Sequence, residues 1–264
     1  YEILIDSREM KNFDLSFMLT MGSGGDTMNA GLEAKLETFI ADHGIRYPLA
    51  QGYGMSELSA AASFCVNDRY KPGSVGIPSL SLTVSVFHPE TGEELNIGEE
   101  GEICVTGPSM MKGYFNKPEE TAHVMRKHDD GQIWIHSGDL GYMDGDGFIY
   151  FRQRIKRMIV TSGYNVYPSQ IENILDAHEA VHMSCVIGVR DPYKMQKVKA
   201  FVVPMPGIEP TEALRQELLE YCKEHVAKYA MPYDVEFKED MPKTLVGKVA
   251  YRVLEEEAAL EETR

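Results

Sequence analysis

The chain lacks the marks of several broad classes of protein. Its 264 residues contain four cysteines, which are widely spaced and include no Cys-x-x-Cys pair. This spacing predicts neither a structural disulfide nor a zinc site, and it indicates a reducing compartment, which we take to be the cytoplasm. No apolar run approaches the roughly 20 residues that span a membrane, so no membrane span is expected. The cysteines are Cys65, Cys104, Cys185 and Cys222.

The chain also lacks an excess of positive charge. It has 26 Lys and Arg residues against 41 Asp and Glu residues, a net charge of −15. This balance disfavours binding to nucleic acid or to an anionic membrane surface. The acidic excess is uneven, because residues 1–152 hold 11 basic and 23 acidic residues whereas residues 153–264 hold 15 and 18. The C-terminal part is therefore the part that we expect to meet an anionic ligand.

The N-terminus lacks both an initiating methionine and a signal peptide, since the chain begins Tyr1-Glu2-Ile3. We interpret the chain as a piece of a longer protein. The sequence contains no internal repeat and no low-complexity tract. Its length allows one large domain or two modest ones.

The first part of the chain has the succession of an αβ domain. The apolar stretch 15–20 predicts a short strand, which runs into the glycine-rich segment 22–26. Apolar residues at helical spacing then predict a helix that ends at Gly44. From about 73 to 151, short strands alternate with turns, which predicts a β-rich subdomain. Its strands are expected at 82–87, 102–106, 132–137 and 148–151.

A basic cluster at residues 152–157 marks the change to a second region. The pattern beyond it predicts an α+β unit. Its expected elements are a helix that begins near Pro168, strands at 183–189 and 198–204, and a helix from about 211 to 228. The fold class is therefore α/β, with a first domain over residues 1–152 and a smaller α+β domain over residues 153–264.

The stretch Gln51 to Glu57 (QGYGMSE) combines groups that suit a nucleotide. Tyr53 offers an aromatic face to a planar base, and the flanking glycines clear space beside it. Ser56 can hydrogen-bond a phosphate. Glu57 can help to hold Mg²⁺, which prefers oxygen ligands and neighbouring phosphates. The alternative is a core tyrosine in a glycine-rich turn that is followed by a solvated glutamate.

The glycine-rich segment Gly22 to Asp26 also has two interpretations. Glycines let backbone amides approach a ligand closely, but they make ordinary turns as well. The segment is not a nucleotide P-loop, because no Lys-Ser/Thr pair follows it. The pair Gly247-Lys248 fails the same test, since Val249 stands where the hydroxyl residue belongs.

Two residues of the β-rich region suit a ribose. Asp139 follows a predicted strand, where its carboxylate can accept hydrogen bonds from a sugar diol. Arg154 comes fifteen residues later, beyond a predicted hairpin, and can pair with the same ribose or with a phosphate. The alternative makes Asp139 a turn residue and Arg154 a surface charge.

Near the C-terminus, the stretch Pro242 to Lys248 places two lysines in a glycine-containing loop. A long, mobile cation such as Lys248 suits a residue that is delivered to a developing negative charge. Two lysines in an ordinary surface turn have the same pattern.

In their order along the chain, these stretches resemble the adenylate-forming superfamily, which comprises acyl- and aryl-CoA synthetases, luciferases and peptide-synthetase adenylation domains. The resemblance runs from about Gly22 to Leu254. Its most specific pieces are Tyr53 to Glu57, Gly101-Glu102-Ile103 with Lys112-Gly113-Tyr114, Ser137-Gly138-Asp139, Arg154 to Glu172, and Pro242-Lys243-Thr244 with Gly247-Lys248.

The resemblance implies a set of nucleotide-binding residues in the first part of the chain. Tyr53 would stack on adenine, Ser56 would touch phosphate, and Asp139 with Arg154 would hold the ribose. The full implied set is Gly24, Gly25, Asp26, Tyr53, Gly54, Ser56, Asp139 and Arg154.

The resemblance also implies the residues of catalysis and of the thiol acceptor. Lys248 would be the catalytic lysine of adenylation, and Glu57 would act in catalysis by binding Mg²⁺. Lys156 falls at the hinge about which the C-terminal domain of such enzymes rotates between two half-reactions. Gly163 falls in the loop that lines the tunnel for the pantetheine of CoA. A carboxylate attacks the α-phosphate of ATP, pyrophosphate leaves, and the thiol then attacks the activated acyl carbon.

The chain departs from the family pattern at several points. Gln153 replaces the usual glycine before the arginine, Ser137 replaces a threonine, and Asp26 replaces a small apolar residue. The Ser/Thr/Gly-rich triphosphate loop and most of the acyl pocket would lie upstream of the first residue. We therefore expect residues 1–152 to be the truncated C-terminal portion of the large AMP-binding domain, residues 153–264 to be the small mobile C-terminal domain, and the chain alone not to adenylate.

The resemblance implies that the parent is an ATP-dependent acyl-CoA synthetase, an acid-thiol ligase that turns a carboxylate, ATP and CoA into acyl-CoA, AMP and pyrophosphate. The acceptor follows from Arg154-Ile155-Lys156 and the stretch 161–168, which are similar to those of CoA ligases. Two alternatives stay open: a free-standing adenylation enzyme that loads a carrier protein, and a non-catalytic nucleotide-binding remnant. The acyl or aryl nature of the acid, its chain length and the oligomeric state stay open with them.

Overall fold

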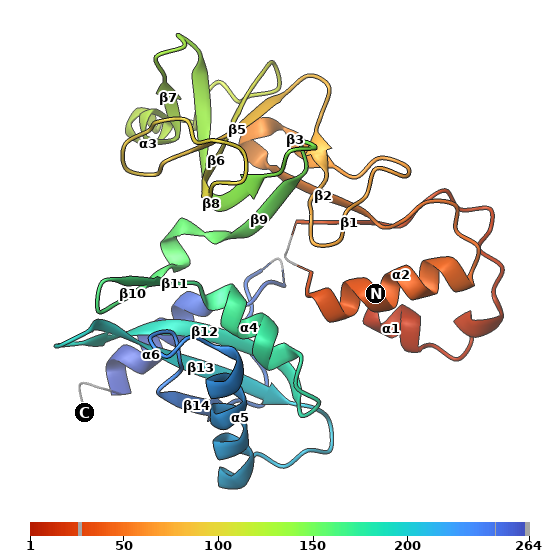
Figure 1. Cartoon of the computed structure of the whole chain (residues 1–264), viewed down its shortest axis with the longest axis vertical. Helices are drawn as coiled ribbons and strands as arrows, with labels where there is room; N and C mark the ends of the chain where they lie inside the picture. Colours follow the sequence, from red (N-terminus) through yellow and green to blue (C-terminus); the bar gives the residue numbers. More distant parts are fainter. Residues whose placement is uncertain (26–27, 246, 262–264) are drawn as a thin grey trace. The chain divides into compact units, whose positions relative to one another are not determined.

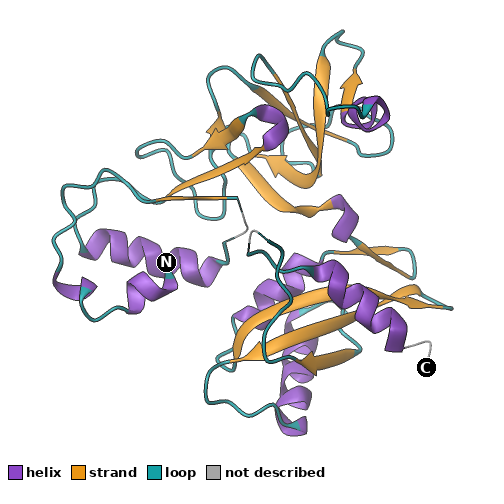
Figure 2. Cartoon of the chain, turned by 180° about the vertical axis from the view of Figure 1, so that it is seen from behind, coloured by secondary structure: helices purple, strands orange, loops and turns teal. Residues whose placement is uncertain are grey.

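A computed structural model describes residues 1–25, 28–245 and 247–261 of the chain. The chain divides into two compact units, Tyr1–Ile155 and Lys156–Arg264. Figure 1 labels the elements of each unit, and Figure 2 colours them by secondary structure. The expected boundary lay after residue 152, and the division falls three residues further along.

The first unit contains a four-stranded sheet in the order β1-β2-β3-β4, in which β1 and β2 are parallel and the other pairs antiparallel. The prediction of a strand at 15–20 was wrong: a turn closed by the Met18 N–H to Leu15 O hydrogen bond, 2.8 Å, lies there instead. The strand begins in the glycines. A Cβ at Gly24 would lie 2.9 Å from Gly52 O, so the two strands meet at a glycine. The strands are β1 (Gly22–Gly24), β2 (Ala50–Met55), β3 (Ala60–Phe64) and β4 (Ile77–Pro78).

The helix expected before Gly44 is confirmed as α2 (Ala30–Asp42), and the short α1 (Glu2–Asp6) contacts it. The Asn29 side chain caps α2 by accepting the Leu32 N–H at 2.7 Å, and Gly44 ends the helix with φ of +68°. The helix buries its apolar face in a core of its own. The buried members of this core are Leu15, Met21, Leu36, Phe39, Ile40, Ile45 and Leu49.

The β-rich subdomain expected over residues 73–151 is confirmed as a five-stranded antiparallel sheet, order β5-β6-β8-β7, with β9 paired to β8. One face packs against the first sheet, because the same core cluster holds Tyr53 and Ala62 of the first sheet with Ile103 and Ile135 of the second. The elements are β5 (Thr83–Phe87), β6 (Gly101–Thr106), α3 (Pro118–Val124), β7 (Met125–Lys127), β8 (Ile133–Met143) and β9 (Ile149–Arg154).

The second unit is built on a sheet in the order β11-β10-β13-β12, with β14 parallel to β13. The predicted α+β succession is confirmed, and the helix expected from about 211 begins at a Thr211 cap that accepts the Leu214 N–H at 3.2 Å. The elements are β10 (Ile159–Thr161), β11 (Tyr164–Val166), α4 (Pro168–Asp176), β12 (Val181–Asp191), β13 (Met195–Pro204), α5 (Glu212–His225), β14 (Asp234–Phe237) and α6 (Tyr251–Glu261).

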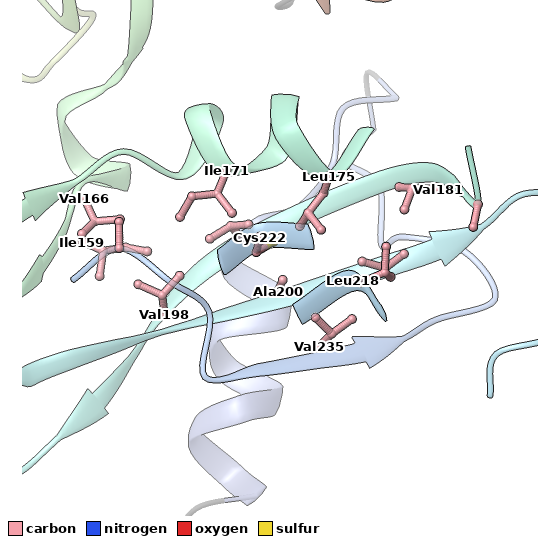
Figure 3. Packing of buried hydrophobic residues seen from close by; sticks show 14 of the residues in the cluster. Ile159, Val166, Ile171, Leu175, Val181, Val198, Ala200, Leu218, Cys222 and Val235 are labelled. Atoms are coloured by element: carbon pink, nitrogen blue, oxygen red, sulfur yellow. The ribbon is translucent and has the colours of Figure 1, made fainter. Parts of the chain in front are cut away.

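Both faces of this second sheet are covered, because alternate residues of a strand point to opposite faces. On one face Val198 and Ala200 of β13 pack with Ile171 and Leu175 of α4 and with Leu218 of α5, as Figure 3 shows. On the other face, a second cluster joins strand residues to α6; its buried members are Cys185, Ile187, Val189, Phe201, Val203, Met241, Leu254 and Ala258.

All four cysteines lie among the described residues, where they are buried and carry free thiols. Burial raises the pKa of Cys222 to about 11, so this thiol is protonated at neutral pH. Across the described ranges, none of the helices has the length and apolar character that crossing a bilayer would need.

The C-terminal residue of α4 generates a stability prediction. Burial raises the pKa of Asp176 to about 6, although the hydrogen bond donated by Ser184 Oγ, 2.7 Å from Asp176 Oδ1, opposes this rise. A negative charge at the C-terminal end of a helix is also unfavourable. Since the folded state holds this proton more tightly than the unfolded state, the carboxyl favours folding below pH about 4, and this contribution is lost as the pH rises through about 6.

We therefore expect Asp176→Asn, which keeps an acceptor for Ser184, to be more stable than the unaltered protein above pH about 6, by on the order of 1 kcal/mol. The two proteins should converge near pH 4. Urea unfolding followed by circular dichroism from pH 4 to pH 8 measures the difference. The exposed Asp129→Asn is the control, and a gain that does not vary with pH would contradict the assignment.

Candidate functional site

The centre of the candidate site is a tyrosine that β2 carries toward a buried acid. Tyr53 is 9% exposed, and its hydroxyl donates to Asp139 Oδ2 at 2.8 Å. Burial raises the pKa of Tyr53 well above its usual value, and the Asp139 carboxylate adds to this rise. The phenol therefore stays protonated and acts as a donor at neutral pH. The Tyr53 ring is also part of the hydrophobic core, and its centroid lies 6.2 Å from that of the Phe151 ring. Tyr53 is therefore a core residue, as the alternative interpretation expected, and its hydroxyl also contacts Asp139.

Asp139 and Arg154 face each other across two neighbouring strands. They are partners in the register of β8 and β9, and Arg154 Nε lies 3.4 Å from Asp139 Oδ1. The carboxylate of Asp139 is 5% exposed, whereas the arginine side chain is 65% exposed. The pair therefore consists of a buried carboxylate and an exposed guanidinium that solvent and solutes can reach. The hairpin predicted between the two residues brings them together.

An open depression of about 480 Å³ lies beside Tyr53. Its lining is mostly backbone and small side chains, which leaves the main-chain groups accessible. A Cβ at Gly54 would lie 2.3 Å from Ala60 O, so β2 and β3 can approach each other only at a glycine. The lining residues are Ser23, Gly24, Gly25, Gly52, Tyr53, Gly54, Met55, Ser56, Ser59, Ala60 and Ala61.

The structure thus brings together most of the predicted nucleotide-binding residues of the first unit. Gly24, Gly25, Gly54 and Ser56 line the same depression as Tyr53. Asp26 falls outside the described residues. The sequence patterns missed Ser59, Ala60 and Ala61, which enter because β3 turns back along β2. The run of three alanines directly after QGYGMSELS was the available signal.

Glu57 sits in a one-turn helix, Ser56–Leu58, at the end of β2. Its Oε1 accepts the Tyr114 hydroxyl at 2.5 Å, and its backbone oxygen accepts the Met111 N–H at 2.7 Å. The hydrogen bond to Glu57 raises the pKa of Tyr114 to about 12, and burial adds to the rise. The Lys112-Gly113-Tyr114 motif therefore orients the predicted metal-binding carboxylate, a link that the sequence patterns did not reveal.

A second group of potential metal ligands lies inside the five-stranded sheet. The ligand atoms of Glu102, Cys104 and His136 all lie within 4.8 Å of one another, and all three residues are buried. His136 Nδ1 is 2.7 Å from Glu102 Oε2. Two ligands about 2.1 Å from one tetrahedral zinc ion would lie roughly 3.4 Å apart. The closer spacing is that of a hydrogen bond, so the group is a hydrogen-bonded network.

The remaining predicted residues belong to the second unit. Gly163 and Ser162 form the two-residue turn between β10 and β11, with φ of +82° and +50°. Lys156 is exposed at the first position of the unit. Lys248 is exposed at the end of a turn in which Thr244 N–H donates to Lys248 O at 2.7 Å. That turn also contains residue 246, which lies outside the described residues.

A small basic pocket of about 80 Å³ lies at the Ser162 end of the β10–β11 turn. Lys197 Nζ lies 4.4 Å from the centroid of the Tyr233 ring. Beside the pocket, the rings of Tyr164 and Tyr229 stack with centroids 4.7 Å apart. The sequence patterns did not single out these lysines, although the more balanced charge of the C-terminal part pointed toward an anion. The lining residues are Thr161, Ser162, Lys194, Lys197, Val198, Lys228, Tyr229, Met231 and Tyr233.

Comparisons with known proteins cover nearly the whole chain. Residues 1–115 match the family described as AMP-binding enzyme, and residues 170–248 match the AMP-binding enzyme C-terminal domain. A long-chain-fatty-acid–CoA ligase of Bacillus subtilis (strain 168) is 41% identical over 96% of this chain and 43% of its own length. A feruloyl-CoA synthase of an Amycolatopsis species is 39% identical over 94% of this chain and 48% of its own.

Solved structures of similar fold include one that has ATP bound. The crystal structure of ATP-bound MatB from Rhodopseudomonas palustris matches with a TM-score of 0.87 and 32% identity, over 98% of this chain and 49% of that one. The chain therefore spans about half the length of the curated relatives that it matches. The motifs, the two matching family domains and the shared fold agree, and the chain belongs to the adenylate-forming superfamily of AMP-binding enzymes, with acyl-CoA synthetases among its relatives.

Proposed function

We propose that this chain supplies the adenine- and ribose-binding platform and the C-terminal domain of an acyl-CoA synthetase. The reaction joins a carboxylate to the thiol of CoA, with ATP split to AMP and pyrophosphate, through an acyl-adenylate. The observation that carries the proposal is the Tyr53–Asp139–Arg154 arrangement, in which Tyr53 also lines the depression. The relatives named as CoA ligases support the same activity.

The platform suits the adenosine part of ATP. A cavity of about 480 Å³ is within the size range of small-molecule sites. The backbone of Gly24 and Gly25 would lie against the base and the acyl group, with the Tyr53 ring beside the base and Gly54 clearing space for it. Ribose hydroxyls would donate to the carboxylate of Asp139, which the Tyr53 hydroxyl already orients. Arg154 would close over the sugar or reach a phosphate.

The phosphate side of the platform fits a magnesium ion. Ser56 lines the depression, and Glu57 follows it with a partly exposed carboxylate. A single carboxylate together with substrate phosphates is a common way to hold Mg²⁺. The ion would supply positive charge to the phosphates when bound. Tyr114 fixes one carboxylate oxygen of Glu57 and so limits the directions in which the other can point.

The second unit would supply the remaining groups in turn. Lys248 would stabilise the charge that develops on the α-phosphate as the carboxylate attacks. Lys156, the first residue of this unit, would act as the hinge that brings up Lys248 in one half-reaction and the Gly163 turn in the other. The basic pocket beside that turn would hold the phosphates of CoA while its pantetheine passes Gly163. We also propose a cytoplasmic location, which the four free thiols support.

The activity itself is tested with the full-length parent protein, ATP, Mg²⁺, a panel of fatty and aromatic acids, and CoA. We expect acid-dependent exchange of pyrophosphate into ATP and the appearance of an acyl-CoA with at least one acid. Adenylate without any acyl-CoA would favour the loading of a carrier protein. No exchange with any acid, together with AMP binding in a calorimetric titration, would favour a non-catalytic nucleotide-binding protein.

Lys248→Ala separates the two half-reactions. Removing a cation from the transferring phosphoryl group is expected to slow adenylation by on the order of 10²–10³-fold. Thioester formation from a supplied acyl-adenylate should change little, because the hinge has then moved this lysine away. Pyrophosphate exchange and acyl-CoA release measure the two steps. Lys243→Ala, which removes the other lysine of the same loop, is the control, and equal losses in both steps would contradict the hinge.

Lys197→Ala tests the basic pocket. Loss of one charged contact to a phosphate should raise the KM for CoA roughly tenfold and leave the KM for ATP unchanged. The effect should shrink when dephospho-CoA replaces CoA if the pocket holds the 3′-phosphate. The control is Lys223→Ala, since that lysine is exposed on α5 and pairs with Glu220 at 2.7 Å. A parallel rise in both KM values would argue against a CoA-specific role.

A further inference from the structure

The strand that carries Asp139 leaves its regular pairing just before that residue. In the ladder between β6 and β8, Glu102 is opposite Leu140, but the next pair is Cys104 with His136. Between these two pairs, β6 therefore has one residue, Ile103, whereas β8 has three, residues 137–139. Residues 137–139 bulge out of the sheet, and Gly138 has φ of +71°. On the β9 side Asp139 pairs with Arg154, so it is on the β6 side that its position depends on what holds the bulge.

Side chains hold the bulge where the ladder does not. Glu102 Oε1 accepts the Gly138 N–H at 2.8 Å. Ser137 Oγ accepts the Asp139 N–H at 3.0 Å and donates to Ile103 O at 2.5 Å. Backbone N–H groups inside a sheet need partners. Here Glu102 of β6 accepts one N–H of the bulge, and Ser137 of the bulge itself accepts another.

The glutamate is in turn fixed by a histidine, and a second histidine contacts the first. Glu102 Oε2 lies 2.7 Å from His136 Nδ1, and His136 Nε2 lies 2.8 Å from His128 Nε2. Because the carboxylate is an acceptor, His136 Nδ1 carries the hydrogen, and the Nε2 of a neutral His136 then accepts the N–H of His128. Glu102 and His136 are each 5% exposed, so this chain of hydrogen bonds runs inside the sheet.

The buried carboxylate is kept charged by these partners. Burial by itself would raise the pKa of Glu102, but the hydrogen bonds from His136 and from the Gly138 N–H lower it below its usual value. An apolar pair at the same positions would fill the sheet without the cost of removing a charge from water. The Glu102 carboxylate stays charged despite this cost, and one of its oxygens accepts the Gly138 N–H of the bulge. We therefore look for its role in the conformation of the bulge.

We propose that Glu102 is a positioning residue, which holds the Ser137–Asp139 bulge so that the Asp139 carboxylate meets the ribose hydroxyls of the nucleotide. Glu102 itself touches no substrate. His136 orients it, and His128 orients His136. The inference rests on the proposed function, because Asp139 has a ribose to meet only if the depression binds a nucleotide.

The main test is Glu102→Asp, which keeps the charge but shortens the side chain by one methylene. The carboxylate then cannot reach both the Gly138 N–H and His136 Nδ1. Affinities for AMP and for 2′,3′-dideoxy-AMP are measured by calorimetry on the whole chain. We expect the preference of the unaltered protein for AMP to fall roughly tenfold in the variant, the amount typical of one charged hydrogen bond, with the affinity for dideoxy-AMP unchanged.

The control is Glu100→Asp. That glutamate pairs with Arg152 at 2.8 Å on the exposed surface, two residues before Glu102, so its variant should keep the preference for AMP. A purely structural role for Glu102 would lower both affinities together, and this result would overturn the inference. An unchanged preference in a folded Glu102→Asp would overturn it as well. Should Glu102→Asp fail to fold, Glu102→Met, which keeps the length without an acceptor, takes its place.

A second readout separates this inference from the proposed function. Hydrogen exchange at the Gly138 amide should be slow in the unaltered protein and in Glu100→Asp, and fast in Glu102→Asp at the same global stability. If the unaltered protein binds neither nucleotide, the proposed function fails. The Gly138 amide then decides the inference by itself: loss of protection in Glu102→Asp alone supports the positioning, and equal protection in all three proteins contradicts it.

Discussion

The buried carboxylate of Asp139 is the constraint on which the first unit depends. It lies in the five-stranded sheet, yet its partner Tyr53 belongs to the four-stranded sheet, 86 residues earlier in the chain. A charged group that is removed from water requires hydrogen-bonding or charged partners. The hydrogen bond from Tyr53 to Asp139 therefore links the two sheets at this acid. The shared core behind Tyr53, with Ile103 and Ile135, gives the tyrosine a fixed position from which to donate. The site is therefore a product of the packing of two sheets and cannot be assigned to either alone.

Local patterns found the parts of this arrangement that depend on nearby residues. The helical spacing before Gly44 and the turn-separated strands over 73–151 predicted the elements, because each reflects the period of one helix or strand. The hairpin between Asp139 and Arg154 also followed from the sequence, since a turn between two strands brings their ends together. The segment 15–20 misled the prediction for a related reason: a short apolar run has the same composition in a strand as in a turn, and here the turn leaves Phe17 and Leu19 exposed.

Local patterns do not reveal contacts between residues that are far apart in the sequence, where a bulge or the packing of a third element decides which side chains meet. Glu102 and His136 are 34 residues apart, and they meet where β6 pairs with β8, beside the shift in the register of that pair. Tyr114 reaches Glu57 across 57 residues through a loop without a periodic pattern. The lysines of the basic pocket come from three segments: Lys194 precedes β13, Lys197 lies in it, and Lys228 follows α5. In each case the sequence names the residue type, and only the folded chain decides which neighbour it has.

The second unit differs from the first in how its sheet is covered. Helices α4 and α5 pack on one face and α6 packs on the other, and each face has its own cluster of buried residues. Hydrophobic burial is non-directional and scales with the area removed from water, so a sheet that is closed on both faces by its own helices holds itself together. Lys248 and the Gly163 turn are exposed parts of such a body. Under the proposed function, a change of backbone angles at Lys156 would move both groups together and leave both cores of this unit intact, as two successive half-reactions would require.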